Sequence, residues 1–127
     1  MYKENCVFCE IAKGRAKAKI IGESASFIAI EDIRPAVEGH TLIIPKNHFD
    51  TLLDIPDELS IEMIRFIRKI AKFLFDKKKG SGFNVIINNF ESAGQEVMHA
   101  KIHVIPRKKG DGIKFLTGQM VGLTYQC

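Results

Sequence analysis

The chain has 127 residues and a formal net charge of +4 at pH 7, and 46% of its residues are hydrophobic. This is the length of one ordinary domain, which can bury a core without disulfide support. No apolar run approaches the ~18 residues that span a membrane, and the first residues lack the pattern of a signal peptide, so we expect a cytoplasmic protein without a membrane partner. The basic clusters at 77–79 and 107–109 indicate solvated faces rather than a nucleic-acid surface.

The first third of the chain predicts one short helix and three strands, near residues 6–13, 19–23, 26–31 and 40–45. The helix is expected to end at Gly14, since glycine tolerates the left-handed conformation that closes many helices. Pro35 fixes its own φ and restrains the residue before it, so residues 32–36 are expected to form a turn.

The longest predicted element is a helix near residues 57–78. Its apolar residues recur at helical spacing: Leu59, Met63, Phe66, Ile67, Ile70, Phe73 and Leu74. Two further strands are expected at 83–88 and 97–105, joined by a loop at 91–94. The segment after them is too apolar for a free tail and is expected to cover the core or a partner subunit through Ile113, Phe115, Leu116, Met120, Val121 and Leu123. This order of elements predicts an α+β fold with an antiparallel sheet in a single domain, 1–127.

The predicted strand at 97–105 carries three nitrogen-bearing side chains. Because side chains alternate along a strand, His99, Lys101 and His103 are expected on one face. The opposite face would carry Ala100, Ile102 and Val104, which suits burial against the long helix. Alternation alone is more typical of an ordinary solvent-facing strand than of a reactive site.

Three cysteines are present, Cys6, Cys9 and Cys127. An odd number suits a reducing compartment, with Cys127 as a spare thiol. The two-residue gap between Cys6 and Cys9 is typical of zinc sites, but alone it leaves a metal site, a redox pair and buried structural thiols open.

Several motifs, taken in order, resemble the histidine triad (HIT) superfamily of nucleotide-binding proteins. They are CVFCEI at 6–11, EDIRP at 31–35, GHTLIIPKNH at 39–48, Asn88, and GQEVMH followed by HVIPR over 94–107. The resemblance covers almost the whole chain, and the order and spacing of the motifs are specific. The cysteine pair is similar to that of the metal-binding branch of the superfamily.

The resemblance implies an antiparallel sheet of about five strands, one long helix packed on it and a short N-terminal helix, in a two-fold homodimer. Residues 1–14 would form a zinc-binding N-terminal segment and residues 108–127 a C-terminal tail. It also implies a chemistry: family enzymes bind a purine nucleoside phosphate, the middle histidine of the triad attacks its α-phosphorus, and water hydrolyses the covalent intermediate.

The resemblance also assigns residues to sites. A structural Zn²⁺ would be held by Cys6, Cys9, His48 and His99. The nucleotide would be bound by Asp32, Ile33, Phe27, Asn88, Gln95, Val97 and His103, and the catalytic group would comprise the residue at the middle position with His103, His99 and His40. Asp32 would contact the ribose. Ile33 and Phe27 suit either the base pocket or the core, Asn88 and Gln95 either phosphate or loop backbone, and His40 either a partner of the triad or the core.

The middle position of the triad is Lys101, so the sequence reads His-Lys-His where the family has three histidines. With an unperturbed pKa of ~10.4, only about one lysine in a few thousand is a free amine at pH 7, a handicap of roughly 4–5 kcal/mol. An amine is also a poorer leaving group than imidazole.

Three interpretations of Lys101 follow. We favour a nucleotide-binding protein with weak or no hydrolysis, in which Lys101 pairs with phosphate as a point charge. The alternatives are a nucleotidyl transferase-like protein that forms a lysyl–nucleotide adduct, and a hydrolase in which another group or an activated water attacks. A competing class is a dimeric interaction module without enzymatic activity.

Overall fold

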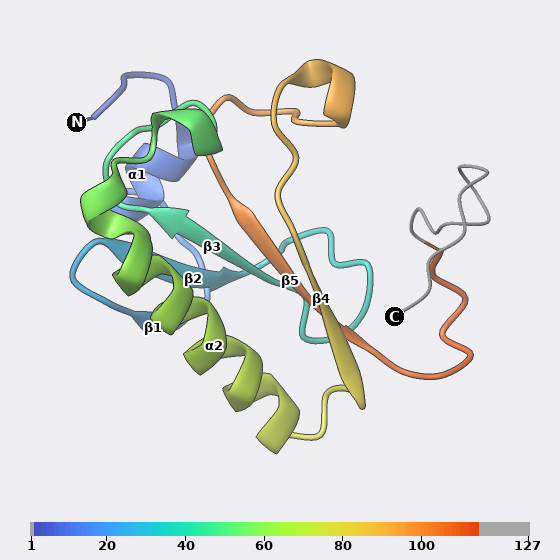
Figure 1. Cartoon of the computed structure of the whole chain (residues 1–127). Coiled ribbons are helices and arrows are strands. Elements are labelled where there is room, and N and C mark those ends of the chain that lie inside the picture. The colour runs from blue at the N-terminus through green and yellow to red at the C-terminus, as the bar shows by residue number, and fades with distance from the viewer. Residues whose placement is uncertain (1, 115–127) are drawn as a thin grey trace.

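The computed structural model describes residues 2–114. Its five strands form one antiparallel sheet in the order β1-β2-β3-β5-β4 (Figure 1). The strands are β1 (Ile20–Glu23), β2 (Phe27–Glu31), β3 (Thr41–Pro45), β4 (Gly82–Ile86) and β5 (Ile102–Arg107). The two α-helices are α1 (Val7–Ala12) and α2 (Ser60–Asp76), and single 3-10 turns lie at Leu52–Asp54, Asp57–Leu59 and Glu91–Ala93. The predicted α+β class, the five-stranded sheet and both helices are confirmed.

The two helices cover opposite faces of the sheet. On the α2 side, the core contains Phe27 and Ala29 of β2 and Ile43 of β3, packed against α2. On the other side, a second cluster of β2 and β3 residues packs against Phe8 and Ile11 of the N-terminal segment. Both faces of the central strands are therefore buried, which explains why residues 27–30 and 42–44 read as nearly continuous apolar runs.

Helix α2 buries the face that its periodicity predicts, with two differences. Phe73 is 42% exposed, although the spacing placed it in the core, and Ala71 is buried instead. The two residues lie at opposite edges of the apolar stripe, where a small rotation of the helix decides which edge is covered. No helix within residues 2–114 has the length and apolar character needed to cross a membrane.

The strand predicted at 97–105 begins only at Ile102. Its last pair with β3 is Ile43↔Ile102, and residues before this pair leave the sheet. The Ala100 N–H instead donates to the Phe49 carbonyl, at 2.6 Å. The prediction that His99 shares a strand face with Lys101 and His103 is therefore wrong, because His99 lies on this departing segment. Ala100, Ile102 and Val104 are buried as expected.

The expectation for the apolar C-terminal residues falls mostly on 115–127, which lie outside the described residues. Within the described part of the tail, Arg107 donates to both carboxylate oxygens of Asp111 and to the carbonyl of Ile113. This pairing fixes residues 107–113 against the end of β5.

Candidate functional site

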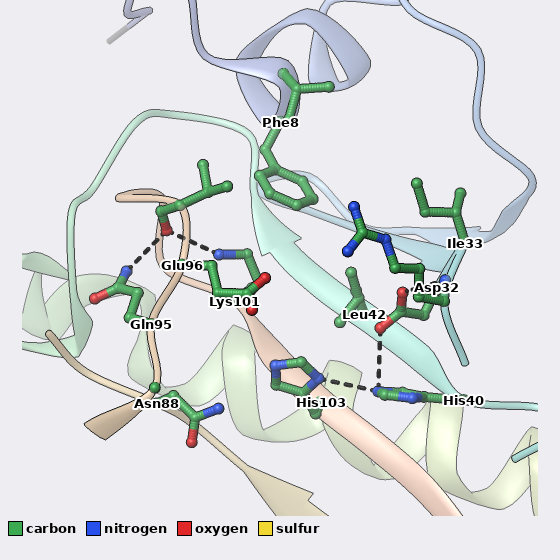
Figure 2. Close-up of a pocket in the computed structure, with 14 residues that line it drawn as sticks. Phe8, Asp32, Ile33, His40, Leu42, Asn88, Gln95, Glu96, Lys101 and His103 are labelled. Carbon is green, nitrogen blue, oxygen red and sulfur yellow. Dashed lines mark hydrogen bonds and ion pairs between the residues drawn. The ribbon is translucent and has the colours of Figure 1, made fainter. Parts of the chain in front are cut away.

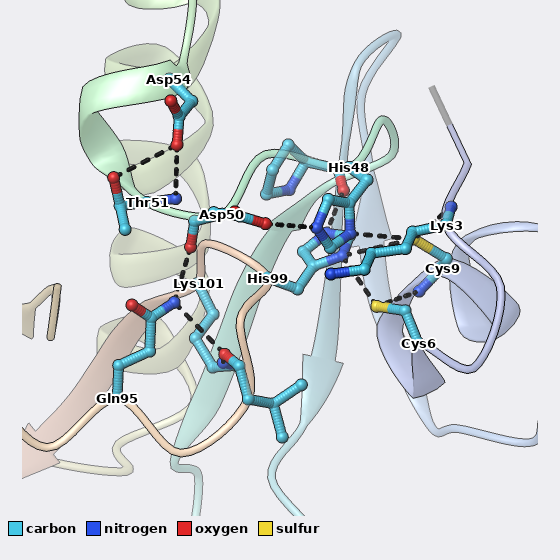
Figure 3. A network of polar contacts seen from close by, with 12 residues as sticks. Lys3, Cys6, Cys9, His48, Asp50, Thr51, Asp54, Gln95, His99 and Lys101 are labelled. Carbon is cyan, nitrogen blue, oxygen red and sulfur yellow. Dashed lines mark hydrogen bonds and ion pairs between the residues drawn. The ribbon is translucent and has the colours of Figure 1, made fainter. Parts of the chain in front are cut away.

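A cluster of two thiols and two imidazoles lies where α1 meets the segment before β5 (Figure 3). The Cys6 Sγ is 3.3 Å from His99 Nδ1, and the Cys9 Sγ is 3.3 Å from His48 Nδ1 and 3.5 Å from His99 Nδ1. One ligand atom from each residue lies within 4.8 Å of all the others. Cys6 and His99 are 93 positions apart in the sequence, yet the fold brings them together in a compact set of two sulfur and two nitrogen donors.

The histidine rings in this cluster are oriented as metal ligands. The outer nitrogen of His99, Nε2, lies 3.0 Å from the Pro45 carbonyl, and that of His48 lies 2.7 Å from Asp50 Oδ1. Because both partners accept, each Nε2 carries the proton and each Nδ1 directs a lone pair at the sulfurs. Burial lowers the pKa of His99 to about 4, which keeps the ring neutral, as a ligand must be.

Cys6 also caps α1, since its Sγ accepts the Cys9 N–H at 3.4 Å. Burial raises the pKa of the Cys9 thiol, so the thiolate form requires a compensating cation. Two thiols and two correctly oriented imidazoles fit a tetrahedral metal ion with all four positions filled by protein.

Beside this cluster, a pocket of about 520 Å³ opens between α1, the turn after β2 and the loop before β5 (Figure 2). Its walls are Val7, Phe8, Asp32, Ile33, Arg34, His40, Leu42, Asn88, Gly94, Gln95, Glu96, Val97, Lys101 and His103. Carboxylate, imidazole and ammonium groups thus converge within a mostly apolar wall, as in many small-molecule sites.

A hydrogen-bonded histidine pair forms the floor of the pocket. The Ala36 N–H donates to His40 Nδ1 at 3.0 Å, and His40 Nε2 lies 2.9 Å from His103 Nδ1. Asp32 Oδ2 is 3.4 Å from the same His40 nitrogen, while Asp32 Oδ1 accepts the Arg34 N–H. Burial lowers the pKa of both His40 and His103, so both rings are neutral at pH 7.

Lys101 also lines the pocket, two residues before His103 in the chain. Its Nζ donates to the Val97 carbonyl at 2.9 Å and lies 4.7 Å from the centroid of the Phe8 ring. Burial lowers the pKa of Lys101, against the opposing charges of Cys6, Glu96 and Asp32. The carbonyl oxygen and the face of the ring are both favourable contacts for an ammonium. The ammonium is held between an N-terminal helix residue and the loop before β5.

Eight of the expected nucleotide-site residues line this one pocket: Asp32, Ile33, His40, Asn88, Gln95, Val97, Lys101 and His103. Phe27 does not; it is fully buried in the core under α2, so its expected place in the base pocket is wrong. His99 is also fully buried and belongs to the Cys/His cluster rather than to the pocket wall. Ile33, by contrast, is 90% exposed and stands at the pocket rim.

The amides of Gln95 and Asn88 have different roles. Gln95 donates to the carbonyls of Asp50 and Val97 and accepts the Phe90 N–H at 2.7 Å, so it organises the loop, the second of the two roles considered for it. The Asn88 side chain makes no hydrogen bond within residues 2–114 and points toward the pocket (Figure 2). Its amide is thus the one of the two that a bound phosphate can use.

Six pocket residues were not identified as site residues from the sequence: Val7, Phe8, Arg34, Leu42, Gly94 and Glu96. Val7 and Phe8 lie between the two cysteines, so a sequence signal existed for them. Once Cys6 and Cys9 are fixed on one side of a six-residue helix, the residues between them must face elsewhere.

Comparison with known proteins places this geometry in a family. The model of the HIT domain matches residues 13–110. An uncharacterized HIT-like protein of Methanocaldococcus jannaschii is 41% identical over 113 residues, which are 87% of this chain and 86% of that protein. An adenosine 5'-monophosphoramidase of Candida albicans is 38% identical, over 82% of this chain and 71% of its own.

Among solved structures, a zinc-bound histidine triad family protein from Mycobacterium smegmatis superposes with a TM-score of 0.81 at 41% identity. The alignment covers 87% of this chain and 81% of that one. The sheet order, the long helix and the sequence motifs all agree with these relatives, and the chain belongs to the HIT family.

Proposed function

We propose that this chain binds purine nucleoside phosphates at the pocket beside the Cys/His cluster, with weak or altered hydrolysis because Lys101 occupies the position of the family's nucleophilic histidine. The observation that carries this proposal is the setting of Lys101. Its Nζ donates to the Val97 carbonyl and lies over the Phe8 ring. Both contacts favour an ammonium, which binds an anion but has no lone pair with which to attack phosphorus.

The remaining pocket groups suit the other parts of a nucleotide. Asp32 Oδ2 faces the pocket floor and can accept from ribose hydroxyls, while its Oδ1 already closes the turn through the Arg34 N–H. Ile33, Val97 and Phe8 provide apolar surface for a base. Lys101, His103 and Asn88 supply donors for phosphate oxygens. Asp32 can therefore close the turn and contact the ribose at once, because each role uses a different oxygen.

The relatives support this class of ligand. One is named an adenosine 5'-monophosphoramidase, and a 35% identical protein of Arabidopsis thaliana, of which the alignment covers 55%, is named an adenylylsulfatase. Both names describe adenosine nucleotides. We infer a nucleoside 5'-monophosphate group as the moiety that the pocket recognises.

We infer that the Cys/His cluster holds a structural Zn²⁺. Its support is the donor set of Cys6, Cys9, His48 and His99, together with the zinc-bound relative. A tetrahedral ion with four protein ligands offers no position for water, so its contribution would be to stability and to the placement of α1. Because such thiolates need a reducing compartment, we assign the protein to the cytoplasm.

We further propose that the protein is a homodimer. Strand β4 is at the edge of the sheet, and its Phe83 and Val85 are 49% and 42% exposed. Val85 pairs with Val104, so these side chains are on the face of the sheet that α2 covers. Among residues 2–114 no strand pairs with the outer edge of β4, and such an edge with adjoining apolar side chains is a surface that a second copy would cover. Light scattering of the native protein and of Val85→Lys tests this: the variant is expected to be monomeric, and a monomeric native protein would contradict it.

The central proposal is tested by titrating AMP into the purified protein, then following adenosine 5'-phosphoramidate by AMP release and by intact mass. We expect saturable AMP binding, slow release and no stable mass increase. A persistent adduct of one nucleotide would establish the lysyl–nucleotide alternative instead. No binding at millimolar AMP would favour the interaction module. Asp32→Ala serves as the matched variant, in which the affinity is expected to fall while the fold is kept.

A further inference from the structure

Asp32, His40 and His103 form a second cluster of potential metal ligands. One ligand atom from each lies within 4.8 Å of the others. Two imidazoles and a carboxylate are a common donor set for transition metals. An imidazole nitrogen can bind a metal only where it is unprotonated, and the hydrogen bonds of the cluster decide which nitrogens carry a proton.

The direction of the network begins at a backbone amide. The Ala36 N–H can only donate, so His40 Nδ1 must accept, at 3.0 Å. In a neutral ring the proton is then on Nε2, the nitrogen that faces Asp32 and His103. This arrangement is the reverse of the Cys/His cluster, where the outer nitrogens of His48 and His99 donate and the inner nitrogens are unprotonated and face the cysteine sulfurs. His40 therefore cannot ligate a metal without losing its bond to Ala36.

The same argument extends to His103. His40 Nε2–H lies 2.9 Å from His103 Nδ1 and 3.4 Å from Asp32 Oδ2, so it donates to the imidazole with the carboxylate as a second acceptor. His103 Nδ1 is thus an acceptor, and the proton of the neutral ring is on Nε2. In Figure 2 the nitrogen of His103 that does not face His40 points into the pocket.

We propose that His40 is a positioning residue that locks His103 in the Nε2–H tautomer, so that His103 presents the pocket with a hydrogen-bond donor and no nucleophilic lone pair. Its application to a phosphoryl ligand rests on the proposed function.

A consequence is that His103 cannot replace the missing nucleophile. The other histidines of the chain are equally unavailable, since His48 and His99 are in the Cys/His cluster and both nitrogens of His40 are bonded. Within residues 2–114, no imidazole presents an unprotonated nitrogen to the pocket. Lys101 and His103 instead face the same space as two donors, an arrangement that suits a bound anion.

The tautomer is measured directly by long-range ¹H–¹⁵N correlation on ¹⁵N-labelled protein at pH 7 without nucleotide. We expect His103 to show a protonated Nε2 and an unprotonated Nδ1. In His40→Phe, which keeps an aromatic ring but has no donor, the signals should move toward a mixture of tautomers. In His40→Gln, whose amide can again donate to His103 Nδ1, the Nε2–H form should return. Circular dichroism of each variant establishes that the fold is kept.

Binding of AMP to the same three proteins gives the second measurement. The affinity of His40→Phe should be roughly tenfold lower, with most of the loss recovered in His40→Gln. A native His103 protonated at Nδ1, or a tautomer unchanged by His40→Phe, would overturn the inference. A native protein that shows the expected tautomer but binds no AMP would overturn the proposed function and leave the role of His40 intact.

Discussion

The substitution Lys101→His tests whether only the nucleophile is missing from this site. An imidazole at position 101 would stand beside the Val97 carbonyl and the Phe8 ring, in the wall of the pocket that His103 also lines. The carbonyl can accept one ring N–H and so leave the other nitrogen unprotonated toward the ligand. The variant should therefore regain both a nucleophile and a good leaving group.

The size of the gain follows from protonation. At pH 7 most of an imidazole of pKa ~6.5 is neutral, against about one in a few thousand for a lysine of unperturbed pKa, a difference on the order of 10³. Burial lowers the pKa of Lys101, which reduces this difference. We expect kcat/KM for adenosine 5'-phosphoramidate to rise by roughly 10²- to 10³-fold.

Lys101→Gln is the matched control, because its amide can donate to Val97 but has neither charge nor nucleophilic nitrogen. It should show no gain in turnover, and its AMP affinity should fall by about tenfold through loss of the charged contact with phosphate. AMP release under single-turnover conditions separates chemistry from product release. If Lys101→His binds AMP normally but turns over no faster than the native protein, the assignment of position 101 as the nucleophile is wrong.

Two further expectations concern stability. Glu62 accepts from the Ser24 hydroxyl and the Ser26 N–H, and these bonds lower its pKa. The stabilisation by Glu62 is therefore present above its unfolded pKa and is lost as the pH falls. Glu62→Gln should lower the free energy of unfolding, measured by urea denaturation, by about 1 kcal/mol at pH 7 and by progressively less toward pH 3. The control Glu58→Gln should leave the free energy of unfolding almost unchanged. Ile43→Ala should lower the free energy of unfolding by about 2–5 kcal/mol, because Ile43 is fully buried. Ile61→Ala, at a position that is 69% exposed, should lower it by less than about 0.5 kcal/mol. Equal losses in the two variants would contradict the assigned core.

The fold could be predicted well because its signals are local. The apolar residues of α2 recur at helical spacing because one face of the helix is buried. The strands β2 and β3 read as apolar runs because both of their faces are buried. Phe27 illustrates the limit of this reasoning. An aromatic residue in a strand suits a core and a base pocket equally, and only the side of the sheet on which α2 packs decides between them.

The sequence motifs named many of the residues that line the pocket, but not the local backbone that holds them. Strand alternation placed His99 beside Lys101, but the backbone leaves the sheet before Ile102 and directs His99 to the cysteines. The role of Gln95 depends on the carbonyls of Asp50 and Val97, which no pattern in the sequence brings together. Tertiary hydrogen bonds of this kind have no sequence period and therefore could not be predicted.

The Cys/His cluster and the pocket are joined through α1. Cys6 caps this helix and Cys9 lies within it, while Val7 and Phe8 between them line the pocket. A helix of six residues is not stable by itself in water, so its position depends on its tertiary contacts. The cluster holds one side of α1, and the packing of Phe8 on the β2–β3 cluster holds another.

Removal of the metal should therefore weaken nucleotide binding although no metal ligand touches the pocket. We expect dialysis against a chelator to lower the thermal midpoint and to reduce AMP affinity by at least as much as Phe8→Ala does, with both properties restored by stoichiometric Zn²⁺. Cys9→Ser should mimic the metal-free protein, and Cys127→Ser should leave the zinc content unchanged. Metal-free protein that keeps full AMP affinity would show that the packing of Phe8 alone positions the pocket wall, and that the cluster serves only to attach the N-terminal segment.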